Sequence, residues 1–174
     1  EGLTVYPNLR DVPGPVDLAV VTVPARMVPD AVRDCAAKGV KAVVVISAGF
    51  AETGPAGRAL QDEIVEIARS ASIRLMGPNG MGIYTAAVRL HTAFDFMPQA
   101  GGISFVSQSG TMGAYLLGIA SDKGYGFNAF LSVGNQADLS MADYIEYLGE
   151  DERTRVIVLY IEGLKDGKRF LKNA

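Results

Sequence analysis

The sequence predicts an α/β protein built from two consecutive doubly wound parallel-sheet units. Apolar runs rich in β-branched residues alternate with segments of helical period, which is typical of parallel strands joined by crossover helices. The same alternation starts again after Gln99-Ala-Gly-Gly102, where two glycines precede a new apolar run. We therefore expect one unit in residues 1–98 and a second unit in residues 99–174.

The first unit carries three apolar runs separated by two helical segments. The expected strands are residues 17–23, 42–47 and 73–76, and the expected helices are residues 28–38 and 57–72. Gly39 stops the first helix, and Leu60, Ile64 and Ile67 recur at helical spacing in the second. Residues 81–98 show no clear period, so we expect an irregular strand pair or a loop that closes this unit.

The second unit repeats the pattern. The expected strands are residues 103–106, 127–133 and 155–161, and the expected helices are residues 111–123, 140–148 and a last one from residue 166 onward. Each unit has only about three strands, fewer than an ordinary open parallel sheet. We therefore expect a fragment, with the first unit clipped at its start and the second at its end.

Composition and charge argue against several classes of protein. The formal net charge is −3 and no basic run occurs, which argues against a nucleic-acid partner. No stretch is long and apolar enough to span a membrane. Cys35 is the single cysteine, so no intramolecular disulfide can form and a cytoplasmic location is expected. No group of residues has metal-ligand spacing.

Candidate binding residues follow the expected strands directly, because ligands of open parallel sheets bind beyond the carboxyl ends of the strands. The most informative loop is Ser107-Gln-Ser-Gly-Thr111, between a strand and a helix. Backbone N–H groups at a helix start bind anions, and the small side chains let a phosphate approach. Ordinary helix capping by serine explains the same residues, and the Gly-Lys-Ser/Thr ending of a Walker A loop is absent.

Two other features have both a functional and a plain interpretation. Glu162 leaves the end of a strand and could orient an imidazole as a triad carboxylate does, or it is simply a solvated carboxylate. Gly49, Gly77 and Gly80 would let backbone N–H groups approach a pantetheine or pyrophosphate, or they form tight turns. The only histidine, His91, is expected to be structural or exposed.

Eight stretches in chain order resemble the α subunit of the ADP-forming acyl-CoA synthetases, relatives of succinyl-CoA synthetase. They are Val5-Tyr-Pro, Pro15-Val-Asp-Leu-Ala-Val, Val23-Pro-Ala, Val44-Val-Ile-Ser-Ala-Gly-Phe-Ala-Glu52, Gly77-Pro-Asn-Gly-Met-Gly82, Val106-Ser-Gln-Ser-Gly110, Ser132-Val-Gly-Asn135 and Leu159-Tyr-Ile-Glu-Gly163. The resemblance implies a Rossmann-like CoA-binding unit followed by a flavodoxin-like ligase unit. It also implies the interconversion of acyl-CoA, ADP and phosphate with carboxylic acid, CoA and ATP, through an acyl phosphate and a phosphohistidine.

The resemblance assigns roles to individual residues. Glu162 would pair with the phosphohistidine, and the transferred phosphate would be held by Ser107, Gln108, Ser109 and Gly110. The CoA site would be lined by Val23, Pro24, Ala25, Ser47, Ala48, Gly49, Phe50, Pro78 and Asn79. The resemblance also implies that ATP or ADP with Mg²⁺ would bind mainly to parts outside this segment. The expected protein partner is a β subunit or a fused ATP-grasp domain, and the expected substrate is a small carboxylic acid. The parent protein is expected to form an oligomer.

The sequence also departs from the family pattern. The family's catalytic histidine lies one strand beyond residue 174, and Leu90-His91-Thr92-Ala93 imitates its loop in the wrong unit, so that role is not transferred to His91. Gly80 stands where many relatives have cysteine. Two alternatives stay open: a CoA-binding regulatory module fused to a protein acetyltransferase, and a dinucleotide- or flavin-binding redox protein, although no dinucleotide fingerprint follows any strand.

Overall fold

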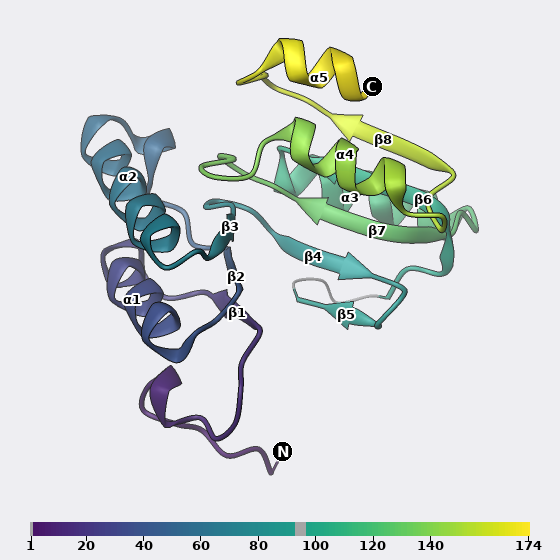
Figure 1. Cartoon of the computed structure of the whole chain (residues 1–174). Coiled ribbons are helices and arrows are strands. Elements are labelled where there is room, and N and C mark those ends of the chain that lie inside the picture. The colour runs from purple at the N-terminus through teal and green to yellow at the C-terminus, as the bar shows by residue number, and fades with distance from the viewer. Residues whose placement is uncertain (1, 93–96) are drawn as a thin grey trace.

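The computed structural model describes residues 2–92 and 97–174. In the first unit the parallel strands lie in the order β1-β2-β3, and helices α1 and α2 cover one face of the sheet (Figure 1). The elements are η1 (Leu9–Asp11), β1 (Leu18–Val21), η2 (Ala25–Met27), α1 (Val28–Lys38), β2 (Ala42–Val45), η3 (Ala51–Thr53), α2 (Pro55–Ser70) and β3 (Arg74–Met76).

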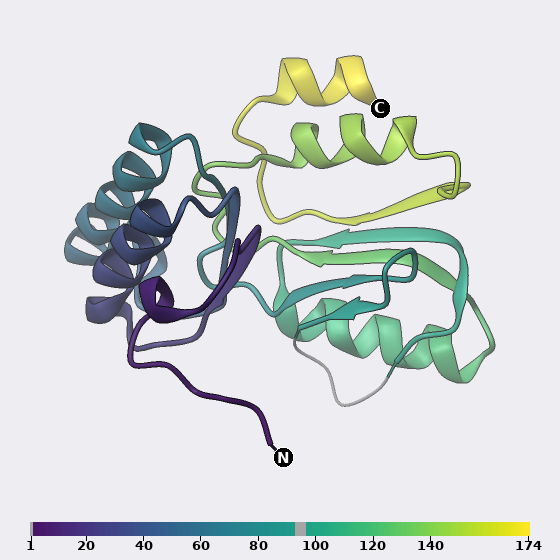
Figure 2. The ribbon, with the colours of Figure 1, turned by 60° about the horizontal axis from the view of Figure 1, so that its bottom comes forward.

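The second sheet has the strand order β5-β4-β7-β6-β8. Its elements are β4 (Gly82–Thr85), β5 (Leu90–His91), β6 (Ala100–Ser107), α3 (Gly110–Asp122), β7 (Phe127–Ser132), α4 (Met141–Glu150), β8 (Val156–Tyr160) and α5 (Gly167–Asn173). Strands β6, β7 and β8 are parallel, whereas β4 runs antiparallel to β7 and β5 antiparallel to β4. Helix α3 covers one face, and α4 and α5 lie over the other (Figure 2).

These units confirm the predicted α/β fold with two parallel-sheet units in succession. Every expected strand and helix is present, and the ends differ by a few residues. The segment expected to close the first unit differs, because β4 pairs with β7 of the second sheet, with Ile83 opposite Leu131. Burial explains this pairing: Tyr84 is 2% exposed and packs in a cluster with Phe105 and Phe130. The boundary at residues 98 and 99 stays a prediction.

The two units share part of their core. Val44 and Met76 of the first sheet are buried in one cluster with Val106, Val133 and side chains of α4. Burial of this continuous apolar surface stabilises the junction, and it brings the strand-end loops of the two sheets together. None of the described helices has the length and apolar character needed to cross a membrane.

Candidate functional site

The second sheet has a point where its strand order reverses. From β6 the chain crosses to β7 on one side and then to β8 on the other, and ligands of open α/β sheets bind outside the strand ends at such a point. A cavity of about 320 Å³ lies there. We call it the Glu162 pocket; it is lined by Asn79, Gly80, Met81, Gln108, Ser109, Gly110, Thr111 and Glu162.

The start of α3 forms one wall of this pocket. Ser109 is the N-cap, and its Oγ accepts a hydrogen bond from the Met112 N–H at 3.2 Å. The N–H groups of Gly110 and Thr111 in the first turn have no acceptor within the helix, so they are available to an anion. Ser107 is fully buried and its Oγ donates to the Ser109 carbonyl at 2.6 Å. Ser109 therefore both caps the helix and lines the pocket, whereas Ser107 is buried behind the turn and stabilises it through its hydrogen bond to the Ser109 carbonyl.

Replacing Ser109 by alanine should lower the free energy of unfolding by about 1 kcal/mol, because the Met112 N–H loses its capping acceptor. The matched control is Ser121→Ala near the other end of the same helix. Ser121 Oγ is buried without a hydrogen-bond partner among the described residues, so its removal should be neutral or slightly stabilising. Urea unfolding of both variants measures the difference, and equal losses would contradict the capping role.

Gln108 connects the helix wall to Glu162. Its Oε1 accepts hydrogen bonds from the N–H of Glu162 and from the N–H of Gly163, the latter at 2.9 Å, and its Nε2 donates to the Gly163 carbonyl at 2.8 Å. The Gln108 N–H donates to the Tyr160 carbonyl at 3.1 Å. The side chain therefore holds the turn that carries Glu162, and only the second Nε2 hydrogen remains for a direct contact with phosphate.

The first unit supplies the third wall through Asn79, Gly80 and Met81. A Cβ on Gly80 would lie 2.3 Å from the Ser132 carbonyl oxygen, so only glycine lets the loop pass this close to β7. The Met81 N–H donates to Ser132 Oγ at 2.8 Å. Asn79, which the resemblance assigns to the CoA site, thus lies in the same pocket as Glu162. Sequence spacing contains no signal that the two units share one cavity.

The predicted CoA residues lie on adjoining loops at the carboxyl end of the first sheet. Ser47 Oγ donates to the Val23 carbonyl, and a Cβ on Gly49, where φ is +108°, would lie 3.0 Å from the Ala25 Cβ. Pro24 and Ala48 are exposed, whereas Pro78 is buried. Phe50 is 0% exposed and belongs to the core of the first unit. The assignment of Phe50 to the CoA site stays a prediction, and with the ring in the core it would involve the backbone of this residue.

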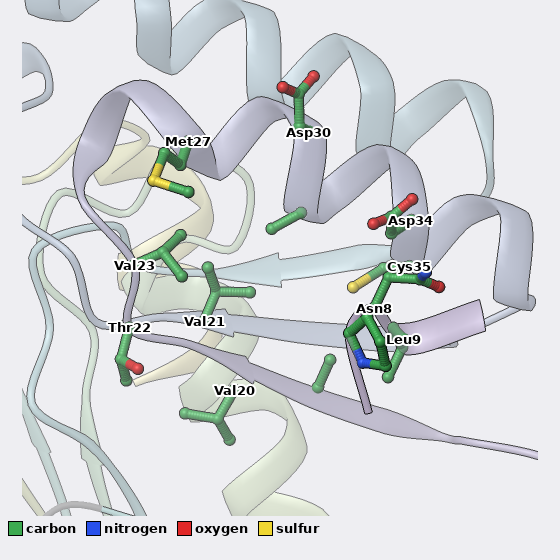
Figure 3. Close-up of a pocket in the computed structure, with 13 residues that line it drawn as sticks. Asn8, Leu9, Val20, Val21, Thr22, Val23, Met27, Asp30, Asp34 and Cys35 are labelled. Carbon is green, nitrogen blue, oxygen red and sulfur yellow. The ribbon is translucent and has the colours of Figure 1, made fainter. Parts of the chain in front are cut away.

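A second cavity of about 390 Å³ runs along β1 and α1 (Figure 3). Its walls include Val20, Val23 and Met27 beside the strand and Asp34 and Cys35 of the helix. Of the predicted CoA residues only Val23 lines it. This cavity is separate from the Glu162 pocket, with which it shares no lining residue.

Cys35 should react slowly with thiol reagents in the folded protein. It is 2% exposed, and burial together with the negative charge of Asp34 raises the pKa of its thiol to about 11. Because the thiolate is the reactive form, the reaction with Ellman's reagent at pH 8 should be at least about 100-fold slower than in the unfolded chain. Rates measured with and without urea test this; similar rates would show an accessible thiolate.

His91 does not line the Glu162 pocket. It lies on β5, opposite Tyr84 of β4, with the two ring centroids 6.2 Å apart in an edge-on arrangement. Because β5 pairs with β4, His91 belongs to the second sheet rather than to the first unit, where the sequence pattern had placed it. An imidazole that enters the pocket has to come from outside the described residues.

Comparison with known families divides the chain much as the two sheets do. Residues 1–86 match the family described as a CoA binding domain, and residues 100–174 match the succinyl-CoA ligase like flavodoxin domain. Strand β4, which pairs with the second sheet, falls inside the first match. The two matches together account for nearly the whole chain.

Individual relatives match along the whole chain. The α subunit of acetate–CoA ligase [ADP-forming] II from Pyrococcus furiosus is 42% identical over 100% of the chain, which spans 38% of that relative. Acetate–CoA ligase [ADP-forming] from Methanocaldococcus jannaschii is 44% identical over 99% of the chain, which spans 24% of it. The chain thus spans well under half the length of these relatives.

A solved structure shows the same fold. The dinucleotide forming acetyl-coenzyme A synthetase 1 of Ca. Korarchaeum cryptofilum, in complex with phosphate and ADP, superposes with a TM-score of 0.94 at 38% identity. The match covers 99% of this chain and 37% of that one.

Proposed function

The chain belongs to the family of the ADP-forming acetate–CoA ligase α subunits, and we propose that it serves an acid–thiol ligase. The proposed reaction interconverts acyl-CoA, ADP and phosphate with a carboxylic acid, CoA and ATP. One observation carries the proposal: the Glu162 pocket places the anion-binding start of α3 and a carboxylate around one cavity at the switch point of the sheet.

The charges of this pocket suit a phosphorylated imidazole. The helix start favours negative charge, and the N–H groups of Gly110 and Thr111 can donate to phosphoryl oxygens. Glu162 would repel a phosphate placed against it, but it can accept a hydrogen bond from the second ring nitrogen of the imidazole. A phosphohistidine supplied from another part of the protein could interact with both walls: its phosphoryl group would bind at the start of α3, and its ring would face Glu162.

In the proposed cycle phosphate attacks the thioester carbonyl, and CoA leaves as the acyl phosphate forms. The phosphoryl group then passes from the acyl phosphate to the imidazole, which releases the carboxylic acid, and from the imidazole to ADP. Within this chain, the start of α3 holds the phosphoryl oxygens in place, and Gln108 holds the turn that carries Glu162. We propose that ADP and its Mg²⁺ bind to a β subunit or a fused ATP-grasp domain.

The proposed CoA site uses backbone more than side chains. The loops around Ala25 and Gly49 approach each other closely because Gly49 has no Cβ, and Pro24 and Ala48 present accessible surface beside them. A pantetheine chain could lie against these loops, with its thiol end directed toward Asn79 and the Glu162 pocket. The thioester, held by loops of the first unit, would then lie next to the phosphate held by the second unit, because residues of both units line the pocket.

Incubation of the whole protein with γ-³²P-labelled ATP and Mg²⁺ should label a histidine. The label should be stable to alkali and labile to acid, and it should disappear when ADP or CoA with the carboxylic acid is added. An unlabelled protein that still binds CoA would support the alternative, a CoA-binding regulatory module of a protein acetyltransferase.

A further inference from the structure

Asn135 lies where loops of both units meet. It follows β7 in a turn whose Gly134 has φ +52°, and a Cβ on Gly134 would lie 2.2 Å from the Pro78 carbonyl oxygen. The Asn135 N–H donates to that same carbonyl at 2.9 Å. The turn after β7 is therefore in direct contact with the loop that carries Asn79.

The side chain of Asn135 joins η3, α2 and the loop that carries Asn79. Its Nδ2 donates to Glu52 Oε2 at 2.5 Å and to Gln61 Oε1 at 3.0 Å. Its Oδ1 accepts from Asn79 Nδ2 at 3.3 Å. A carboxylate can only accept hydrogen bonds, so the amide nitrogen of Asn135 has to face Glu52 and the amide oxygen has to face Asn79.

Glu52 extends these contacts to the predicted CoA loop. Its Oε1 accepts from the Gly49 N–H at 2.5 Å and from the Phe50 N–H at 3.0 Å, so its two oxygens divide between this loop and Asn135. Burial acts to raise the pKa of Glu52, but the hydrogen bonds from Asn135, Phe50 and Gly49 outweigh it and the pKa lies below its usual value. Glu52 is thus held as the carboxylate that orders Gly49 and Phe50.

We propose that Asn135 is a positioning residue that makes the predicted CoA loop and the Glu162 pocket depend on one another. It holds Glu52 through its amide nitrogen and Asn79, a wall of the pocket, through its amide oxygen. A ligand that shifts one of these loops changes the hydrogen bonds of the other, and such an effect is reciprocal. The identity of the ligands that the two loops bind rests on the proposed function. The hydrogen bonds by which Asn135 links the two loops do not depend on it.

Asp138 makes a contact between the two units that lies apart from both loops. Asp138 accepts from the Leu75 N–H and from Arg74 Nε, both at 3.1 Å, and it touches neither the CoA loop nor the pocket. Asp138→Asn is therefore the matched control: it weakens a polar contact between the units without reaching Glu52 or Asn79.

The test exchanges the donor and the acceptor. Asn135→Asp keeps the shape of the side chain but places a second carboxylate against Glu52, which repels it. Glu52→Gln alone keeps an acceptor for Gly49 and Phe50 but sets two amide nitrogens against each other, unless one of them turns over. The double variant, with both substitutions, restores one hydrogen bond with reversed polarity. The introduced glutamine amide can donate to the introduced aspartate and still accept from the Gly49 and Phe50 N–H groups.

Amide hydrogen exchange followed by NMR is the first measurement. In N135D the amides of Gly49 and Phe50 should exchange about 10- to 100-fold faster, since their hydrogen bonds to the Glu52 carboxylate are lost. The Asn79 N–H donates to the Ser47 carbonyl of the same loop at 3.0 Å, so its exchange should become faster as well. The double variant should return to within about threefold of the wild type, and D138N should leave these amides unchanged. Uniform acceleration along the whole chain, including Val44 in the core, or failure of the double variant to recover, would overturn the proposal.

Kinetics of the whole protein are the second measurement. N135D should raise the KM for CoA and the KM for phosphate together by about tenfold, whereas D138N should change neither. A wild-type protein without any histidine labelling would refute the proposed function and leave the exchange result to decide the coupling. A labelled wild type whose N135D variant exchanges and binds normally would refute the coupling alone.

Discussion

Replacing Glu162 by glutamine in the whole protein should slow phosphohistidine turnover by about two to four orders of magnitude, the usual contribution of one positioned acid–base or electrostatic group. The change keeps the shape of the side chain and removes its charge. The glutamine can still accept a hydrogen bond from the ring, but the imidazole loses the negative charge that orients it and stabilises its positively charged form. Rapid-quench measurement of label transfer from the phosphorylated protein to ADP gives the rate directly.

A matched control separates this role from a general effect of charge. Glu152→Gln makes the same chemical change at an exposed turn outside the Glu162 pocket, and it should leave the rate unchanged. Thermal unfolding of both variants should match the wild type, because Glu162 is exposed and its side chain supports no buried contact among the described residues. A normal transfer rate in Glu162→Gln would remove Glu162 from the proposed mechanism.

Elements with a strong local signal could be predicted from the sequence. Residues 42–45, which are rich in β-branched side chains, form strand β2. Gly39 ends α1 with φ +78°, the left-handed conformation that glycine adopts readily at a helix end. The placement of Ser109 beside Glu162 was also predictable, because both follow strands whose carboxyl ends face the same edge of one sheet. In these cases the local pattern and the topology of the fold point to the same answer.

The features that could not be predicted depend on contacts between distant residues. Gln108 and Gly163 are 55 positions apart, and no spacing rule links a glutamine amide to the backbone of a turn so remote in the chain. Asn135 and Glu52 are 83 positions apart and belong to different units. The pairing of β4 with β7 was missed for a related reason, since a strand of four residues gives too short a pattern to identify its sheet.

Phe50 ties a predicted CoA-binding loop to the core of the first unit. It lies in the Ser47-Ala-Gly-Phe50 loop, where the resemblance places CoA, yet its ring is 0% exposed in a core cluster that includes Val28 and Ile64. Helix α2 packs closely against its backbone, since a Cβ on Gly57 would lie 1.9 Å from the Phe50 carbonyl oxygen. The ring of Phe50 therefore fixes the loop to the core, and the backbone of the same loop is proposed to face the ligand.

Phe50→Ala should lower the free energy of unfolding by about 3–5 kcal/mol, because the substitution leaves a cavity that the surrounding side chains fill only in part. Phe50→Leu retains most of the apolar volume and should lose less than half as much. Urea unfolding monitored by circular dichroism measures both values. In Phe50→Leu, which stays folded, the affinity for CoA should remain within about threefold of the wild type, because the ring itself reaches no ligand. A Phe50→Ala variant with wild-type stability and weakened CoA binding would instead place the ring in the binding site and refute its role as a core anchor.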